Sequence, residues 1–145
     1  RLMANRSDDA AFERAVEDVA AGDAEEQVRL AELHEVAGGV PVGLGDDAHT
    51  ASIFPGTDLV YNHEATVASV WVEKLNTFRI SLTAPLINKA KNIAFITFGE
   101  NKAIALSHVI GDEEKDFGLY PAQLIKPVNG SLAWFVDEAA AASLK

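Results

Sequence analysis

Short apolar segments alternate with helix-like segments from Val40 onward, and this alternation limits the architectures open to the chain. Strands are expected over residues 40–42, 66–72, 79–82, 91–98 and 132–136, and helices after 83, over 100–110 and over 137–144. Strands separated by helices favour an α/β fold with a mainly parallel sheet flanked by helices. Ligands of such sheets bind beyond the carboxyl ends of the strands. Residues 43–50 and 99–102 occupy that position and are therefore the first places to search for a site.

The residues before this region have a different character. Apolar positions at helical spacing occur over 8–21 and 24–36, on an acidic background, and glycines at 22, 38 and 39 interrupt them. A length of 145 residues suits a single domain. We therefore expect one domain over 1–145, with an acidic helical segment over 1–39 and an α/β core over 40–145.

The overall charge narrows the possible partners. A formal net charge of −10 argues against non-specific nucleic-acid binding, which needs a basic surface, and means that an anionic small molecule must be held by a local cluster of donors.

The apolar runs fall short of the roughly 18 residues of a membrane helix, and residues 1–9 lack the apolar core of a signal peptide. Because cysteine is absent too, we expect a cytoplasmic protein without a membrane partner. The sequence leaves the oligomeric state open.

The most informative stretch is the glycine-framed loop over residues 43–56. It places Asp47 two positions from His49, behind Gly43 and Gly45. A carboxylate beside an imidazole can orient it, and histidine is a suitable general base near neutral pH. From the residues alone, an ordinary surface loop with a capping aspartate and an incidental histidine remains equally open.

Three other chemistries are less consistent with this loop. Residues 43–48 also fit the loose dinucleotide fingerprint Gly-x-Gly-x-x-Ala, but two aspartates there would repel a pyrophosphate. Asp46, Asp47 and His49 have side chains that can hold a metal, yet no second histidine lies at helical spacing and there are no thiolates, so no metal is expected. A Gly-x-Ser-x-Gly nucleophile elbow is missing from the sequence. Outside the loop, Trp71 and Trp134 are expected to be core residues.

A second candidate site follows the strand at 91–98. Gly99 leads into a helix there, and the N–H groups at a helix start form an anion site. Lys102 in the first turn opposes the helix dipole by about 0.3–1 kcal/mol, a conflict that a bound phosphate would remove. Judged on physics alone, a lysine that extends into water is about equally compatible with the pattern.

The loop resembles the signature of the 6-phosphogluconolactonase family, Gly-x-Gly-x-Asp-Gly-His-Thr-Ala-Ser-Leu-Phe-Pro-Gly. Ala48 stands where the signature has glycine. The related glucosamine-6-phosphate deaminases share the Asp-Gly-His core, but Thr50-Ala51-Ser52 and Phe54-Pro55-Gly56 favour the lactonases. The resemblance continues through 79–83, similar to Arg-x-Thr-Leu-Thr, through 99–103, similar to Gly-x-x-Lys-Ala, and through 121–140. It covers about two-thirds of the chain, from Val42 to the C-terminus.

The resemblance implies an α/β fold of the sugar-phosphate isomerase and lactonase type. The implied activity is hydrolysis of 6-phospho-D-glucono-1,5-lactone to 6-phosphogluconate in the pentose phosphate pathway, without metal or organic cofactor. His49 would be the general base and Asp47 its orienting partner. Substrate contacts would come from Lys102 and Arg79, toward the phosphate, and from Gly45 and Gly99.

The resemblance also marks departures. Family members carry a Gly-Gly-Ser/Thr phosphate loop and an Asp-Glu-Arg element before the histidine motif, and this sequence has neither. The chain is therefore expected to be truncated at the N-terminus, as a fragment or a short form. Two alternatives to lactone hydrolysis follow: a glucosamine-6-phosphate deaminase or isomerase-like enzyme, and a non-catalytic sugar-phosphate-binding remnant.

Overall fold

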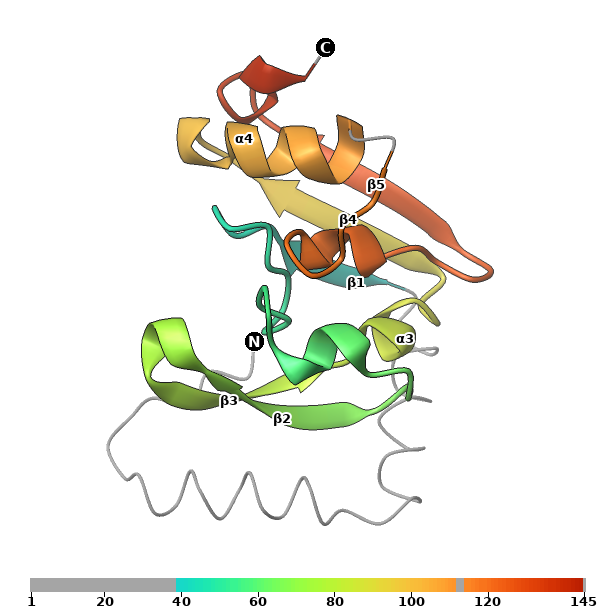
Figure 1. Cartoon of the computed structure of the whole chain (residues 1–145). Helices are drawn as coiled ribbons and strands as arrows, with labels where there is room; N and C mark the ends of the chain where they lie inside the picture. The colour runs from blue at the N-terminus through green and yellow to red at the C-terminus, as the bar shows by residue number, and fades with distance from the viewer. Residues whose placement is uncertain (1–38, 112–113, 145) are drawn as a thin grey trace, which may run out of the picture.

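The computed structural model describes residues 39–111 and 114–144 (Figure 1). The helical segment expected over 1–39 therefore lies outside the described residues, except for Gly39. The elements follow in the order β1 (Val40–Gly43), η1 (Asp58–Tyr61), β2 (Val67–Val72), η2 (Glu73–Leu75), β3 (Thr77–Leu82), α3 (Ala84–Ile87), β4 (Asn92–Thr97), η3 (Glu100–Lys102), α4 (Ala103–Leu106), η4 (Ser107–Gly111), η5 (Pro121–Leu124), β5 (Ser131–Val136) and η6 (Ala140–Ser143).

A parallel sheet of order β1-β4-β5 forms the centre of the described region. Val40 lies opposite Ile93, and Phe95 lies opposite Trp134. The continuous helical segment η3–α4–η4 runs across one face of this sheet (Figure 1). Because β1 and β4 run parallel, both strands end at the same edge of the sheet, where the loops that follow them can meet.

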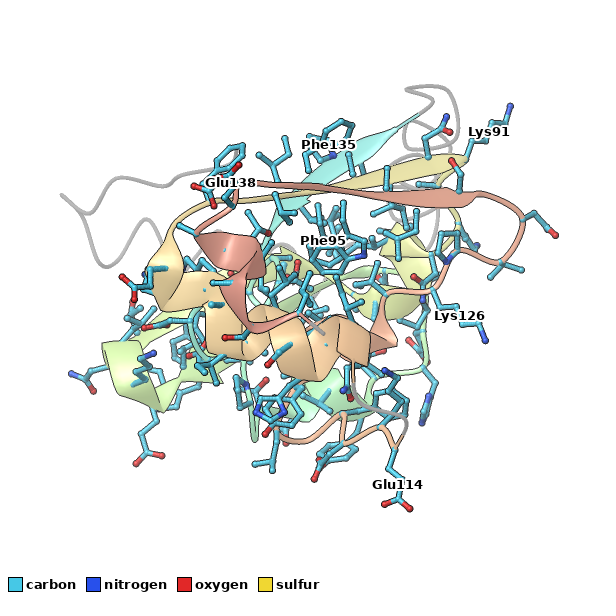
Figure 2. All side chains as sticks on the ribbon, turned by 90° about the horizontal axis from the view of Figure 1, so that it is seen from above. Lys91, Phe95, Glu114, Lys126, Phe135 and Glu138 are labelled. Atoms are coloured by element: carbon cyan, nitrogen blue, oxygen red, sulfur yellow. The ribbon has the colours of Figure 1, made fainter. Side chains whose placement is uncertain are left out.

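The two faces of the sheet differ in burial because strand residues alternate in direction. Ile93 and Phe95 are completely buried, whereas Ile96 is about half exposed. The Phe95 ring stacks on Trp134 with centroids 3.9 Å apart and planes 6° apart. Figure 2 shows Phe95 on the helix side of the strands and Phe135 on the opposite side. One part of the core thus lies between the sheet and the helical segment, and the same buried cluster continues into β2 and the loop after β1.

Strands β2 and β3 form a separate antiparallel hairpin. Val67 lies opposite Leu82, and Val72 lies opposite Thr77 across the turn. The pairing directs Val70, Val72 and Ser81 to the buried side and Trp71 and Phe78 to the other side. The expectation that Trp71 is a core residue is therefore wrong: it is 45% exposed and contacts Phe78 edge-on.

The expected strands are present, and the α/β class with a parallel sheet and flanking helices is confirmed. The pairing of β2 with β3 differs from a parallel arrangement, since local sequence predicts that a strand forms but not which neighbour it pairs with. The helix expected over 137–144 is shorter than expected, because only Ala140–Ser143 form a helical turn, η6. None of the helices within residues 39–111 and 114–144 combines the length and apolar character that a membrane span requires.

Candidate active site

The loop after β1 closes on itself through its own backbone. The Gly45 N–H donates to the His49 carbonyl at 2.8 Å, and the Ala48 N–H donates to the Gly45 carbonyl at 3.1 Å. The Thr50 hydroxyl donates to the Gly43 carbonyl at 2.8 Å, which ties the loop to the end of the strand. These bonds hold the backbone on both sides of His49 in one conformation.

Ala48 occupies the position where the family signature has glycine, and its backbone explains that preference. Its φ is 61°, in the left-handed region that glycine adopts freely and alanine adopts at a cost of roughly 1–2 kcal/mol. The residue is buried, and its carbonyl accepts a hydrogen bond from the Ala122 N–H at 2.9 Å. The substitution therefore leaves the loop shape intact but adds local strain.

The loop brings Asp47 and His49 into direct contact. Asp47 Oδ1 lies 2.5 Å from His49 Nδ1 and also accepts the His49 backbone N–H at 3.3 Å. The imidazole stacks on Phe54, with centroids 4.0 Å apart and planes 21° apart. With Nδ1 engaged by the carboxylate and one ring face covered, Nε2 is the nitrogen left to exchange a proton with a ligand.

Glycine is required at position 45 because there is no room for a side chain, and not because the backbone adopts an unusual angle. A Cβ built on it would lie 2.0 Å from His49 Nδ1, 2.3 Å from Cε1 and 2.7 Å from Asp47 Oδ1. Since such contacts are impossible, any side chain at this position would displace the imidazole, the carboxylate or both. Gly45 therefore supports the pair by leaving room for it.

Asp47 has a second partner that the sequence did not reveal. Lys74, in the turn between β2 and β3, donates to Asp47 Oδ2 at 2.8 Å and lies 3.7 Å from Asp46 Oδ1. Partial burial acts to raise the pKa of Asp47, but the hydrogen bonds from Lys74 and His49 outweigh it and lower this pKa to about 2. Asp47 is therefore a carboxylate throughout the neutral range. Nothing in the local sequence around Lys74 signals this contact across 27 positions.

A cavity of about 560 Å³ opens beside the histidine. Its volume falls within the range typical of small-molecule sites. Residues 40–45 line it together with Ala51, Leu82 and Ile87, and the two lining residues with polar side chains are His49 and Lys102. The histidine loop and the helical segment after β4 thus meet at one cavity, as expected for loops beyond parallel strand ends.

The turn at Gly99 differs in part from expectation. Gly99 has a φ of 95°, and Lys102 follows in the first helical turn, with its N–H donating to the Gly99 carbonyl at 3.0 Å. The Gly99 N–H is not available to an anion, because it donates to Asp137 Oδ1 at 3.0 Å and Oδ2 at 3.2 Å. Gly99 is also not part of the cavity wall. Lys102 is therefore the group that this turn contributes to the cavity.

Arg79 lies on β3, exposed and outside the cavity wall. It shares a face of the hairpin with Ser81, whose hydroxyl accepts the Ser52 N–H at 3.0 Å. The hairpin therefore runs alongside the histidine loop and keeps Arg79 on the side facing that loop. Among the described residues, no cluster of three histidine, aspartate or glutamate side chains is arranged to hold a metal ion.

Comparison with known proteins extends this picture. A family model described as glucosamine-6-phosphate isomerases/6-phosphogluconolactonase matches residues 4–134. The 6-phosphogluconolactonase of Rattus norvegicus is 40% identical over 101 residues, which cover 69% of this chain and 38% of the rat protein. That of Nostoc sp. is 39% identical over 105 residues, which cover 72% of this chain and 42% of the relative.

A solved structure agrees in fold. The 6-phosphogluconolactonase from Leishmania guyanensis superposes with a TM-score of 0.64 and 24% identity, over 74% of this chain and 41% of that chain. The chain thus spans about two-fifths of the length of the relatives it matches.

Proposed function

The chain belongs to the family of glucosamine-6-phosphate isomerases and 6-phosphogluconolactonases, and from this premise we propose that it contributes to hydrolysis of 6-phospho-D-glucono-1,5-lactone. The product would be 6-phosphogluconate, as in the pentose phosphate pathway. The relatives of about 40% identity are lactonases, which favours this reaction over deamination within the family.

One observation supports the proposal most strongly. The Asp47–His49 pair, with Nδ1 held at 2.5 Å, borders the same cavity as Lys102. A base and a cation on one cavity suit a substrate that has a reactive ester at one end and a phosphate at the other. This arrangement also supplies the local donor that an anionic substrate requires in a chain of net charge −10.

The chemistry follows from the free ring nitrogen. His49 Nε2 would take a proton from a water whose oxygen forms a bond to the lactone carbonyl carbon. Collapse of the tetrahedral intermediate would break the bond between that carbon and the ring oxygen, and the imidazolium would return its proton to the departing oxygen. The ionised Asp47 would stabilise the imidazolium in between and hold the ring in the correct tautomer.

Lys102 would hold the phosphate, and Arg79 would contribute from the hairpin beside the loop. Binding energy from a remote phosphate can position the reacting carbonyl against the water, which accounts for a large part of the rate in such reactions. No metal or organic cofactor is part of this scheme.

The test is lactone hydrolysis, corrected for spontaneous ring opening, in three variants. His49→Ala should lower kcat/KM by at least about 100-fold. Lys102→Met should raise KM and also lower kcat, because the phosphate contact both binds the substrate and positions its carbonyl. Lys89→Met, an exposed lysine outside the cavity, is the matched control and should keep wild-type values.

The outcomes separate the possible functions. Wild-type kcat/KM in His49→Ala would refute the assignment of the base. Release of ammonia from glucosamine 6-phosphate, without lactone hydrolysis, would instead assign the chain to the deaminase branch. Binding of 6-phosphogluconate without turnover of either substrate would identify a non-catalytic sugar-phosphate-binding domain.

A further inference from the structure

The turn that joins β2 to β3 brings a lysine onto the histidine loop. Strand pairing ends with Val72 opposite Thr77, so only four residues form the turn. Three of them make the helical turn η2, and Asn76 reverses the chain with a φ of 46° and an N–H that donates to the Glu73 carbonyl at 2.9 Å. Asparagine is one of the few residues that tolerate this backbone region. The turn is thus short and internally bonded, which restricts where Lys74 can point.

The hairpin is attached to the loop at a second place. The Ser52 N–H donates to the Ser81 hydroxyl at 3.0 Å, and that hydroxyl donates to the Leu82 carbonyl at 2.9 Å. Ser81 is 4% exposed, so this contact is inside the protein. The hairpin therefore holds the loop at two places: the Ser52–Ser81 hydrogen bond lies after His49, and the Asp47–Lys74 hydrogen bond lies before it.

The contact at Asp47 divides the carboxylate between two partners. Oδ1 faces His49 Nδ1 at 2.5 Å, and Oδ2 faces Lys74 Nζ at 2.8 Å. With both oxygens engaged on opposite sides, rotation of the carboxylate would break one of the two bonds. Resting on the proposed function, we propose that Lys74 is a positioning residue: it locks the Asp47 carboxylate in the orientation that presents His49 to the substrate.

Lys74 also acts through charge. Its ammonium lies 2.8 Å from Asp47 Oδ2 and 3.7 Å from Asp46 Oδ1, so it offsets part of the negative charge of both carboxylates. Its hydrogen bond also helps to lower the pKa of Asp47 to about 2, so this carboxylate stays ionised beside the imidazole.

The experiment compares Lys74→Met, Lys74→Arg and the control Lys89→Met in the full chain. Lys74→Met should lower kcat about two- to fivefold with KM unchanged, because the pair is exposed and Lys74 does not border the cavity. Lys74→Arg, which keeps the charge and a hydrogen-bond donor, should restore the wild-type kcat.

A second measurement is independent of turnover. The side-chain carboxyl carbon of Asp47, assigned with Asp47→Asn, is followed by NMR as the pH is lowered to about 2. In Lys74→Met the pKa of Asp47 should rise from about 2, because the hydrogen bond from Lys74 is lost, and in Lys89→Met it should not change. An unchanged pKa of Asp47 together with an unchanged kcat would overturn the proposal. A raised pKa of Asp47 in a chain that hydrolyses no lactone would support the positioning role of Lys74 and refute the proposed function instead.

Discussion

Replacing Gly45 by alanine should disrupt the candidate site by a displacement that can be worked out from the structure. The new Cβ would lie 2.0 Å from His49 Nδ1, and ordinary van der Waals contact begins near 3.4 Å. The loop backbone cannot give way easily, because Gly45 is bonded to His49 and Ala48 through its N–H and carbonyl. The imidazole must therefore move by roughly 1.4 Å, which separates it from Asp47 and from the face of Phe54.

A displacement of about 1 Å at a catalytic group costs about 100-fold in rate. We therefore expect Gly45→Ala to lower kcat/KM for lactone hydrolysis by at least about 100-fold. Overpacking of the loop should also reduce the free energy of unfolding by about 1–3 kcal/mol, as measured by urea titration. The pKa of Asp47 should rise from about 2, because the hydrogen bond from His49 is lost, and carboxyl carbon NMR can follow that change.

Gly111→Ala is the matched control, because its Cβ would meet no atom of the described residues within 4 Å. It should keep wild-type activity and the low pKa of Asp47. If Gly45→Ala retains wild-type kcat/KM and a pKa of Asp47 near 2, the argument that this glycine makes room for the imidazole is wrong.

Three further predictions concern stability, each measured by urea unfolding. Ala48→Gly should stabilise the chain by about 0.5–1 kcal/mol, since relief of the left-handed strain exceeds the added entropy of the unfolded chain; destabilisation would contradict this. The lowered pKa of Asp47 contributes stability that is complete above about pH 4 and is lost as the pH falls toward 2. After solvent screening, this contribution to the free energy of unfolding should be under about 1 kcal/mol. Asp47→Asn should remove the pH dependence, whereas Asp58→Asn should retain it. Phe95→Ala should cost about 3–5 kcal/mol because the ring is fully buried against Trp134, and equal losses in the exposed Phe135→Ala would refute the assignment of the core face.

The parts of the fold that could be predicted from the sequence are those set by neighbours along the chain. The apolar run at Ile93 and Phe95 identifies a buried strand because alternation is a local property. Asp47 and His49 could be paired because they are two positions apart in a loop framed by glycines. Such relations depend on a few consecutive backbone angles and need no knowledge of the tertiary arrangement.

The features that escaped prediction depend on contacts between distant segments. Lys74 donates a hydrogen bond to Asp47, 27 positions away in the sequence, and the Gly99 N–H donates to Asp137, 38 positions away. Trp71 has a large apolar side chain of the kind usually found in a core. It lies, however, on the face of the two-stranded hairpin that remains exposed. Side-chain chemistry indicates which contacts are possible, but only the placement of the hairpin and of β5 decides which ones form.

The two distant contacts also explain how an acidic chain can present a site to an anion. Asp46 and Asp47 stand beside the cavity and would by themselves repel a phosphorylated substrate, in a chain whose net charge is already −10. Lys74 offsets these carboxylates from the hairpin, while Lys102 presents its own charge at the cavity wall. Since long-range attraction is unavailable, recognition under the proposed function must rest on short-range donors held in fixed positions. The hydrogen bonds that anchor the hairpin to the loop and Gly99 to Asp137 supply that rigidity, so we expect substrate binding to depend on the placement of these lysines rather than on total charge.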